Sequence, residues 1–283
     1  MSKNREQPIN ISKLFDLTGR VAIITGGAGM LGLKYAEAIA EMGGIPVLVD
    51  LKKESCQEAE QYIQSLFNGD VLGIQADVTE KSQIGQMVEQ VMERFGRIDI
   101  LVNNAAMDAK FDADHANQHL TEFENYPLAF WQRSLEVNLT GMFICAQKVT
   151  GPMLAQGKGV IVNISSHYGL IGPDQRLYKT VDSEGPMQYK PADYSVSKSG
   201  VNGLTRYLAT YFAGKNIRVN SLVPGGVFSN HDPEFVRHYS YRTPLGRMAT
   251  PNELCGPLVF LVSDASSYMT GANLVVDGGW TAW

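Results

Sequence analysis

The chain has 283 residues, of which 44% are hydrophobic and 19% are charged, as in an ordinary globular protein. Its formal net charge is −5 and it contains no run of Lys or Arg, so nucleic acid and anionic membrane surfaces are poor candidate partners. The first residues lack the apolar core of a signal peptide, and no apolar stretch is long enough to span a bilayer. These features, with three widely spaced cysteines, predict a cytoplasmic protein without disulfides.

Short apolar runs alternate with helical patterns along the chain. The runs Val21–Thr25 and Ile45–Asp50 are rich in β-branched residues, which is typical of buried strands. Further strands are predicted at residues 71–75, 100–103, 159–165, 217–223 and 273–277. Helices are predicted at residues 33–42, 55–67, 82–95, 129–156, 194–212 and 233–239, and another begins at a capping box formed by Thr250 and Glu253.

Strands that alternate with helices predict a parallel sheet covered on both faces. We therefore expect a Rossmann-type, doubly wound α/β fold with about seven strands. No change in composition marks a second domain, so residues 1–283 are predicted to form one domain. Polar insertions near residues 107–127 and 172–192 interrupt the alternation, and we expect them to surround the substrate pocket.

Glycines dominate the turn after the first predicted strand, Thr25–Gly32. Residues without side chains let the backbone approach a pyrophosphate at the positive end of the following helix. Asp50 closes the next strand, where a carboxylate can bind both hydroxyls of an adenosine ribose and repels a 2′-phosphate. Although Lys52 and Lys53 follow closely, this combination predicts NAD as the cofactor, with NADP less favoured. The alternative is that Asp50 only caps the following turn.

A tyrosine and a lysine stand four residues apart in the segment YSVSK, residues 194–198. A phenol with a pKa of roughly 10 is a poor base at neutral pH. On a helix, Tyr194 and Lys198 project from one face, so the ammonium can favour the phenolate. No lysine follows Tyr168, Tyr178 or Tyr189 at this spacing, which leaves Tyr194 as the candidate acid/base.

These motifs occur in an order that resembles the short-chain dehydrogenase/reductase family, from about Leu17 to Gly279. The resemblance rests on five segments, TGGAGMLG, NNAA (103–106), NISS (163–166), YSVSK and PGGVFS (224–229). More weakly, the C-terminal half is similar to dehydrogenases of bacterial surface-sugar pathways, which act on sugar or nucleotide-sugar hydroxyls. The resemblance implies an NAD(P)-dependent oxidoreductase that interconverts a secondary alcohol and a ketone.

The resemblance also implies residue roles. Ser166 would hydrogen-bond the reacting oxygen, Asn138 would anchor a water relay, and Tyr194 with Lys198 would handle the proton. Asn103 would lie near the adenosine, and Ser165 would be structural. The implied cofactor-binding residues are Gly26, Gly29, Met30, Leu31, Gly32, Asp50, Asp77, Val78, Asn104, Ala105, Ala106, Tyr194, Lys198, Pro224, Gly225, Val227 and Ser229.

Three positions and one spacing depart from the family's pattern. Met30 occupies the place of the usual middle glycine, Ala106 replaces a commoner glycine, and Ser229 replaces a threonine. The segment between Ser166 and Tyr194 is longer than is common in the family. None of these departures removes a catalytic group, but they put any analogy of substrate in doubt.

Polar residues in the expected pocket walls favour a hydroxylated, sugar- or polyol-like substrate. His167, Gln175, Asn230 and His231 are the candidate substrate contacts. An alternative is that the insertions only build an oligomer. The family is commonly homodimeric or homotetrameric, and we expect Trp280 and Trp283 to pack against a neighbouring subunit.

Two alternatives concern the presence of a metal and of catalysis. His115 and His119 have the spacing of a helical metal pair, but no third ligand of matching spacing follows, so we expect no metal site. A non-catalytic nucleotide-binding sensor or scaffold would keep the fold but usually loses the tyrosine or lysine. The intact set of Asn138, Ser166, Tyr194 and Lys198 favours an enzyme.

Overall fold

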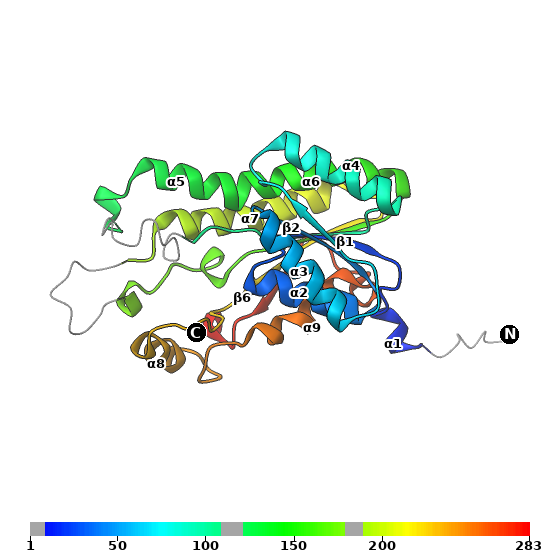
Figure 1. The fold of residues 1–283 in the computed structure, drawn as a ribbon. Coiled ribbons are helices and arrows are strands. Elements are labelled where there is room, and N and C mark those ends of the chain that lie inside the picture. Colours follow the sequence, from blue (N-terminus) through cyan, green and yellow to red (C-terminus); the bar gives the residue numbers. More distant parts are fainter. Residues whose placement is uncertain (1–8, 109–120, 179–188) are drawn as a thin grey trace.

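A parallel sheet of seven strands forms the centre of the computed structural model, which describes residues 9–108, 121–178 and 189–283 (Figure 1). The strand order is β3-β2-β1-β4-β5-β6-β7, and every neighbouring pair is parallel. The strands are β1 (Val21–Thr25), β2 (Ile45–Asp50), β3 (Leu72–Gln75), β4 (Ile100–Asn103), β5 (Gly159–Ile164), β6 (Ile217–Pro224) and β7 (Asn273–Val276). The predicted doubly wound, Rossmann-type sheet is confirmed.

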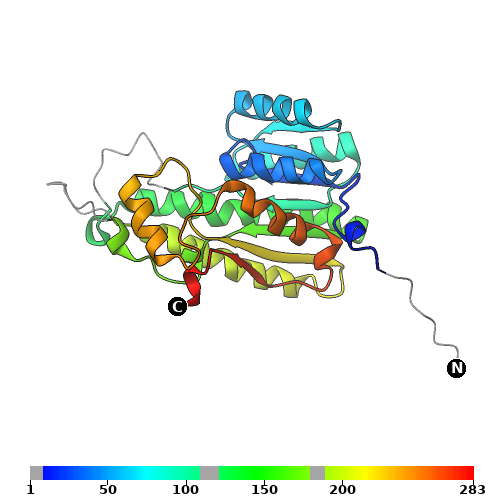
Figure 2. The ribbon, with the colours of Figure 1, turned by 90° about the horizontal axis from the view of Figure 1, so that it is seen from below.

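Helices cover both faces of the sheet (Figures 1 and 2). One face carries α4 (Lys81–Phe95), α6 (Gly141–Gln156) and α7 (Ala192–Tyr211), and the other carries α2 (Met30–Glu41), α3 (Lys53–Leu66) and α9 (Cys255–Val262). The remaining helices are α1 (Ile11–Leu14), α5 (Leu128–Leu135) and α8 (Pro233–Arg242). Strands β2 and β4 lie on opposite sides of β1, so the order in which strands are added reverses there. A crevice is therefore expected at the carboxyl ends of β1 and β4.

The alternation of side chains along the strands builds two apolar layers. Val21 and Ile23 pack toward α4 and α6, whereas Ala22 and Ile24 pack toward α2 and α9. All four side chains are fully buried, which explains why the strand sequence is apolar at successive positions. Buried apolar area of this extent is the main stabilising contribution to the fold.

The predicted long helix at residues 129–156 contains an irregularity. Between α5 and α6, residues Glu136–Thr140 form a π-helical turn rather than α-helix. Such turns are rare and occur often at functional sites. Here the turn carries the buried side chain of Asn138.

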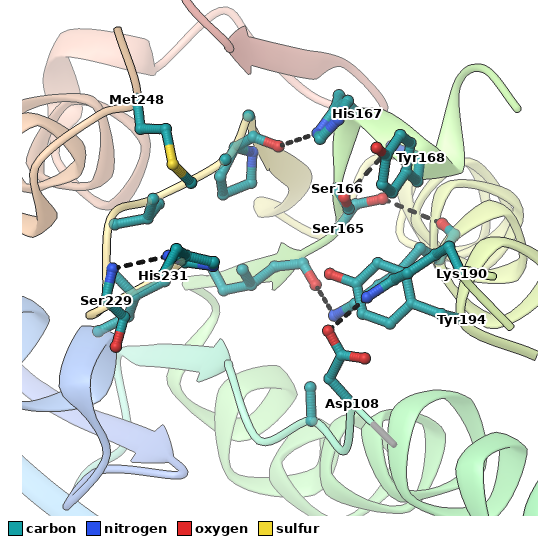
Figure 3. Close-up of a pocket in the computed structure, with 18 of the residues that line it drawn as sticks. Asp108, Ser165, Ser166, His167, Tyr168, Lys190, Tyr194, Ser229, His231 and Met248 are labelled. Atoms are coloured by element: carbon teal, nitrogen blue, oxygen red, sulfur yellow. Dashed lines mark hydrogen bonds and ion pairs between the residues drawn. The ribbon is translucent and has the colours of Figure 1, made fainter. Parts of the chain in front are cut away.

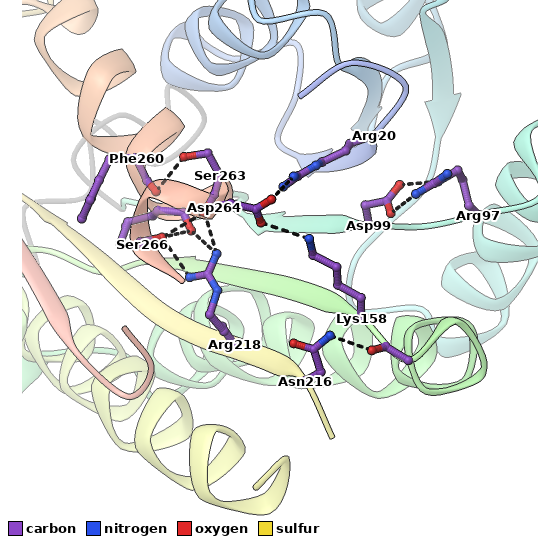
Figure 4. A network of polar contacts seen from close by, with 12 residues as sticks. Arg20, Arg97, Asp99, Lys158, Asn216, Arg218, Phe260, Ser263, Asp264 and Ser266 are labelled. Carbon is purple, nitrogen blue, oxygen red and sulfur yellow. Dashed lines mark hydrogen bonds and ion pairs between the residues drawn. The ribbon is translucent and has the colours of Figure 1, made fainter. Parts of the chain in front are cut away.

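Ion pairs join the segments at the amino-terminal end of the strands, opposite the predicted site (Figure 4). Arg20, just before β1, lies 2.6 Å from Asp264, and Lys158, just before β5, lies 3.0 Å from the other oxygen of Asp264. Arg218 of β6 donates to the carbonyl oxygens of Leu261 and Ser263. These contacts fix α9 and the following turn against the sheet.

Within the described ranges, no helix is both long and apolar enough to cross a membrane. The predicted capping box before α9 is present, because the backbone N–H of Thr250 donates to Glu253 at 2.8 Å.

Candidate active site

Two cavities lie at the carboxyl ends of the strands and share a wall. The first, of about 300 Å³, is enclosed by the glycine-rich turn and the ends of β2 and β3. The second, of about 520 Å³, contains the side chains of Ser166, Tyr194 and Lys198. Both are lined by Met30, Leu31, Asn104 and Ala106. The arrangement suits an elongated ligand that runs from the first cavity into the second.

The glycine-rich turn is shaped by close backbone contacts. A Cβ on Gly32 would lie 2.0 Å from the carbonyl oxygen of Gly26, and Gly26 itself has a φ of +61°. Gly29 is the N-cap of α2 and offers no side-chain cap, so the first N–H groups of that helix face the turn. This cradle fits a pyrophosphate group, which helix N-termini bind through N–H groups.

Asp50 lies at the end of β2 and lines the first cavity. Its carboxylate accepts hydrogen bonds from the backbone N–H groups of Ala28, at 3.1 Å, and Leu51, at 2.8 Å. The acid is therefore fixed against the glycine-rich turn. Arg133 of α5 lines the same cavity and pairs with Asp77 at 3.6 Å, a contact that the sequence analysis missed because the two residues are far apart in the chain.

Of the two neighbouring asparagines, Asn104 lines both cavities and Asn103 lines neither. Asn103 is fully buried, and its side chain donates to Asn163 at 2.9 Å, so it braces β4 against β5. The side chain of Asn104 donates to the carbonyl oxygens of Thr25 and Gly26 and lines both cavities. Asn103, expected near the adenosine, lines neither cavity, because its side chain bonds to β5 and α6.

Tyr194 and Ser166 lie in the second cavity (Figure 3). Lys198 lines the same cavity. Burial raises the pKa of Tyr194 and the charge of Asp108 adds to this effect, whereas a hydrogen bond with Ser166 lowers it. Burial also lowers the pKa of Lys198 to about 8. The ammonium of Lys198 donates to the carbonyl oxygen of Ile164 at 2.9 Å and lies 5.8 Å from the centroid of the Tyr194 ring.

Asn138 lies behind the wall of this cavity and does not line it. Its side chain accepts from the backbone N–H of Met107 at 2.6 Å and donates to the carbonyl oxygen of Met107 at 2.9 Å. It also donates to Ser197 on α7. Ser165 donates to the carbonyl oxygen of Lys198, which ties β5 to α7.

The predicted site residues are largely brought together. Of the cofactor candidates, Gly32 lines neither cavity, because it is buried beneath the turn, and the others line one or both. His167 and His231 line the second cavity, as do Pro224, Gly225, Val227 and Ser229. Gln175 and Asn230 do not: the first bonds to the backbone of Lys190, and the second is exposed. His115 and His119 lie outside the described residues.

The wall of the second cavity is more aromatic than the sequence indicated. Tyr168, Tyr178, Phe235 and Tyr239 surround the space next to Tyr194. Burial lowers the pKa of His167 to about 4, so this side chain is neutral at physiological pH. Its Nδ1 lies 3.3 Å from the carbonyl oxygen of Pro224. Aromatic rings here cannot be read from spacing, since they come from separate parts of the chain.

Two charged residues of this cavity were missed entirely. Asp108, after β4, and Lys190, before α7, form an ion pair beside Tyr194 (Figure 3). Each belongs to one of the two predicted insertions, which therefore do contribute to the cavity wall. No motif marks either residue, and only the fold places them together.

The two C-terminal tryptophans differ in how deeply they are buried. Trp280 is 1% exposed and stacks on Tyr239 with the ring centroids 4.2 Å apart, so the prediction that it packs against another subunit was wrong. The hydroxyl of Tyr239 in turn accepts from the backbone N–H of Gly226 at 2.5 Å. Trp283 is 75% exposed.

Known proteins resemble this chain in sequence and in fold. The family model adh_short_C2, described as "Enoyl-(Acyl carrier protein) reductase", matches residues 27–281. The chain is 32% identical to an NAD-dependent glycerol dehydrogenase of Listeria innocua, over 95% of this chain and 96% of that protein. It is 36% identical to a 3-alpha-(or 20-beta)-hydroxysteroid dehydrogenase of Mycobacterium bovis, over 94% and 91% of the two chains.

A solved structure agrees with these sequence matches. The gluconate 5-dehydrogenase of Burkholderia cenocepacia, in complex with NADP and tartrate, has a TM-score of 0.82 and 30% identity. The match covers 97% of this chain and 100% of that one. The fold, the cavities and these relatives define a Rossmann-type oxidoreductase. The chain belongs to the short-chain dehydrogenase/reductase family.

Proposed function

We propose that the protein is an NAD-dependent dehydrogenase that oxidises a secondary alcohol on a polar, polyol- or sugar-like molecule. The observation that carries the proposal is the meeting of Tyr194, Ser166 and Lys198 in a cavity that adjoins the glycine-rich cradle. A catalytic site beside a cavity that fits a dinucleotide supports hydride transfer. A sensor or scaffold would not require these catalytic side chains.

Each side chain has a task that follows from its position. The phenolate of Tyr194 takes the proton of the substrate hydroxyl, and Ser166 donates a hydrogen bond to the same oxygen. The ammonium of Lys198 favours the phenolate. Asn138 holds Met107 and α7 in place, which fixes the floor of the site. A nicotinamide bound along the shared wall would supply the hydride acceptor.

The preference for NAD rests on Asp50. A carboxylate fixed at the end of β2 repels a 2′-phosphate and can accept hydrogen bonds from ribose hydroxyls. The glycerol dehydrogenase of Listeria innocua is named as NAD-dependent, whereas the gluconate 5-dehydrogenase structure holds NADP. Lys52 and Lys53 do not line the first cavity, which supports NAD for this chain.

A polar substrate is supported by the charged pair Asp108 and Lys190 in the cavity wall. The aromatic rings opposite could stack against the C–H faces of a sugar ring, and they also suit a cyclic alcohol such as cyclohexanol. The relatives named above act, by their names, on both polar and steroid alcohols.

The direct test is reduction of NAD and NADP by the purified protein with a panel of polyols, sugar acids, nucleotide sugars and cyclohexanols. The proposal predicts turnover with NAD and a polyol or sugar substrate. Turnover confined to cyclohexanols would contradict the proposed polar substrate class but not the proposed dehydrogenase activity. Tight NAD binding without turnover of any panel member would favour the sensor reading and contradict the enzyme.

A further inference from the structure

Among the described residues, the lysine ammonium nearest to the Tyr194 ring belongs to Lys190, outside the family motif. Its Nζ lies 3.9 Å from the ring centroid, whereas the Nζ of Lys198 lies 5.8 Å away. A cation this close to an aromatic face interacts favourably with it, and more so when water is excluded. The side chain of Lys190 is only 6% exposed, so little solvent screens its charge.

The position of Lys190 is built into the fold. The side-chain amide of Gln175 accepts from the backbone N–H of Lys190 at 2.8 Å and donates to its carbonyl oxygen at 3.1 Å. The partner Asp108 is placed in the same manner, because the amide of Asn138 makes both hydrogen bonds to the adjacent Met107. A buried ammonium paired with a half-buried carboxylate is expensive to desolvate, so such a pair is weak evidence for stability and calls for another explanation.

We propose that Lys190 is a second positioning cation for Tyr194, which stabilises the deprotonated side chain together with Lys198, and that Asp108 limits this effect by pairing with Lys190. The proposal deepens the proposed function and rests on Tyr194 as its acid/base. Opposite charges at these distances have opposite effects on a phenolate. Lys190 therefore favours ionisation of Tyr194, and Asp108 opposes it.

Other titratable groups also lie around Tyr194 and are left unaltered in sequence when this pair is changed. They come from α7 itself, from the turn after β5, from the insertion and from α8, namely Asp193, Lys198, His167, Tyr168, Tyr178 and Tyr239. His167 is neutral at physiological pH, and burial raises the pKa of Tyr168, Tyr178 and Tyr239, so these four side chains keep their charge near neutral pH. Lys198, with a pKa of about 8, is common to the wild type and every variant compared. The effect of Asp108 and Lys190 on the ionisation of Tyr194 can therefore be measured apart from the effects of these other groups.

The test is the pH dependence of kcat/KM for alcohol oxidation in the full-length protein. Tyr194 must be deprotonated to act as base, so the acid limb reports its ionisation. In Lys190→Met the acid limb is expected to move to higher pH by about 1 unit or more. In Asp108→Asn it is expected to move to lower pH. In the double variant, which carries neither charge, it should lie between the two.

Lys158→Met is the matched control, because it removes a lysine from an ion pair with Asp264 at the far end of the sheet (Figure 4). It should leave the acid limb unchanged. Loss of activity in both single variants without opposite shifts of the limb would mean that the pair is only structural. A shift in the same direction for both would equally contradict the proposal.

A second readout does not depend on turnover. The absorbance of tyrosinate in each protein, minus that of the same protein carrying Tyr194→Phe, measures the ionisation of Tyr194 directly. If the wild type oxidises no alcohol, the proposed function fails, yet this titration still decides between opposite shifts and none. Opposite shifts support the role of Lys190, and their absence overturns it.

Discussion

In the proposed function, Asp50 determines the preference between the two dinucleotides. Its carboxylate is fixed by the N–H groups of Ala28 and Leu51 at the edge of the first cavity, where we expect the adenosine ribose. Asp50→Asn keeps an acceptor oxygen but removes the charge. We expect the ratio of kcat/KM for NAD to that for NADP to fall by about tenfold, because repulsion of the 2′-phosphate is lost. Steady-state kinetics with both cofactors measure the ratio, and an unchanged ratio would assign the preference elsewhere.

Burial of His167 is expected to make the free energy of unfolding depend on pH. It is 3% exposed, and its Nε2 has no hydrogen-bond partner among the described residues. Its pKa is lowered from 6.5 to about 4, so the unfolded chain binds a proton at higher pH than the folded one. Stability attributable to His167 is therefore present above pH 6.5 and is lost as the pH falls toward 4.

His167→Gln should remove this dependence. Between pH 7 and pH 4.5 the free energy of unfolding of the wild type is expected to fall by about 2 kcal/mol more than that of the variant. Urea unfolding of both proteins at pH 7 and pH 4.5 measures this difference in the free energy of unfolding. His238→Gln, on the outer part of α8, serves as the control. An equal decrease in the wild type and His167→Gln would show that the imidazole is already protonated or solvated in the folded state.

At the scale of elements, the C-terminal turn Trp280–Ala282 supports the loop between β6 and α8. Trp280 stacks on Tyr239, and the hydroxyl of Tyr239 holds the backbone of Gly226. Trp280→Ala should therefore destabilise the fold by about 3–5 kcal/mol, as for other large buried aromatic residues. Thermal or urea unfolding measures the loss. Trp283→Ala, at an exposed position, should change stability by less than about 0.5 kcal/mol, and equal effects would contradict this assignment.

The elements also show what the sequence could and could not predict. The strands themselves, the glycine-rich turn and the shared helix face of Tyr194 and Lys198 follow from local patterns, because periodicity and turn chemistry are local. The ion pair of Asp108 and Lys190 depends on two insertions meeting across the fold. Likewise, Trp280 has an internal partner only because α8 folds back over the C-terminus. No pattern within either segment carries that information.

For the whole molecule, the expected homodimer or homotetramer has a candidate surface. Helix α7 exposes Val196, Tyr207 and Tyr211 along one face, and Tyr207 stacks on Tyr211. Exposed apolar groups of this kind commonly mark subunit contacts. We expect two or four copies in solution, and Tyr207→Glu combined with Tyr211→Glu should shift the protein to a smaller species. Light scattering after size exclusion measures the mass, and an unchanged mass would place the contact on another face.

The proposed function depends above all on Tyr194 as the group that transfers the proton during hydride transfer. The most direct measurement is the rate of NAD reduction in a single turnover by wild type, Tyr194→Phe and Tyr178→Phe, together with the affinity of each for NADH. Tyr178 lines the same cavity and serves as the matched control. We predict a decrease of at least about 100-fold in Tyr194→Phe alone, with NADH affinity unchanged. A rate in Tyr194→Phe close to that of the wild type would show that Tyr194 does not transfer the proton.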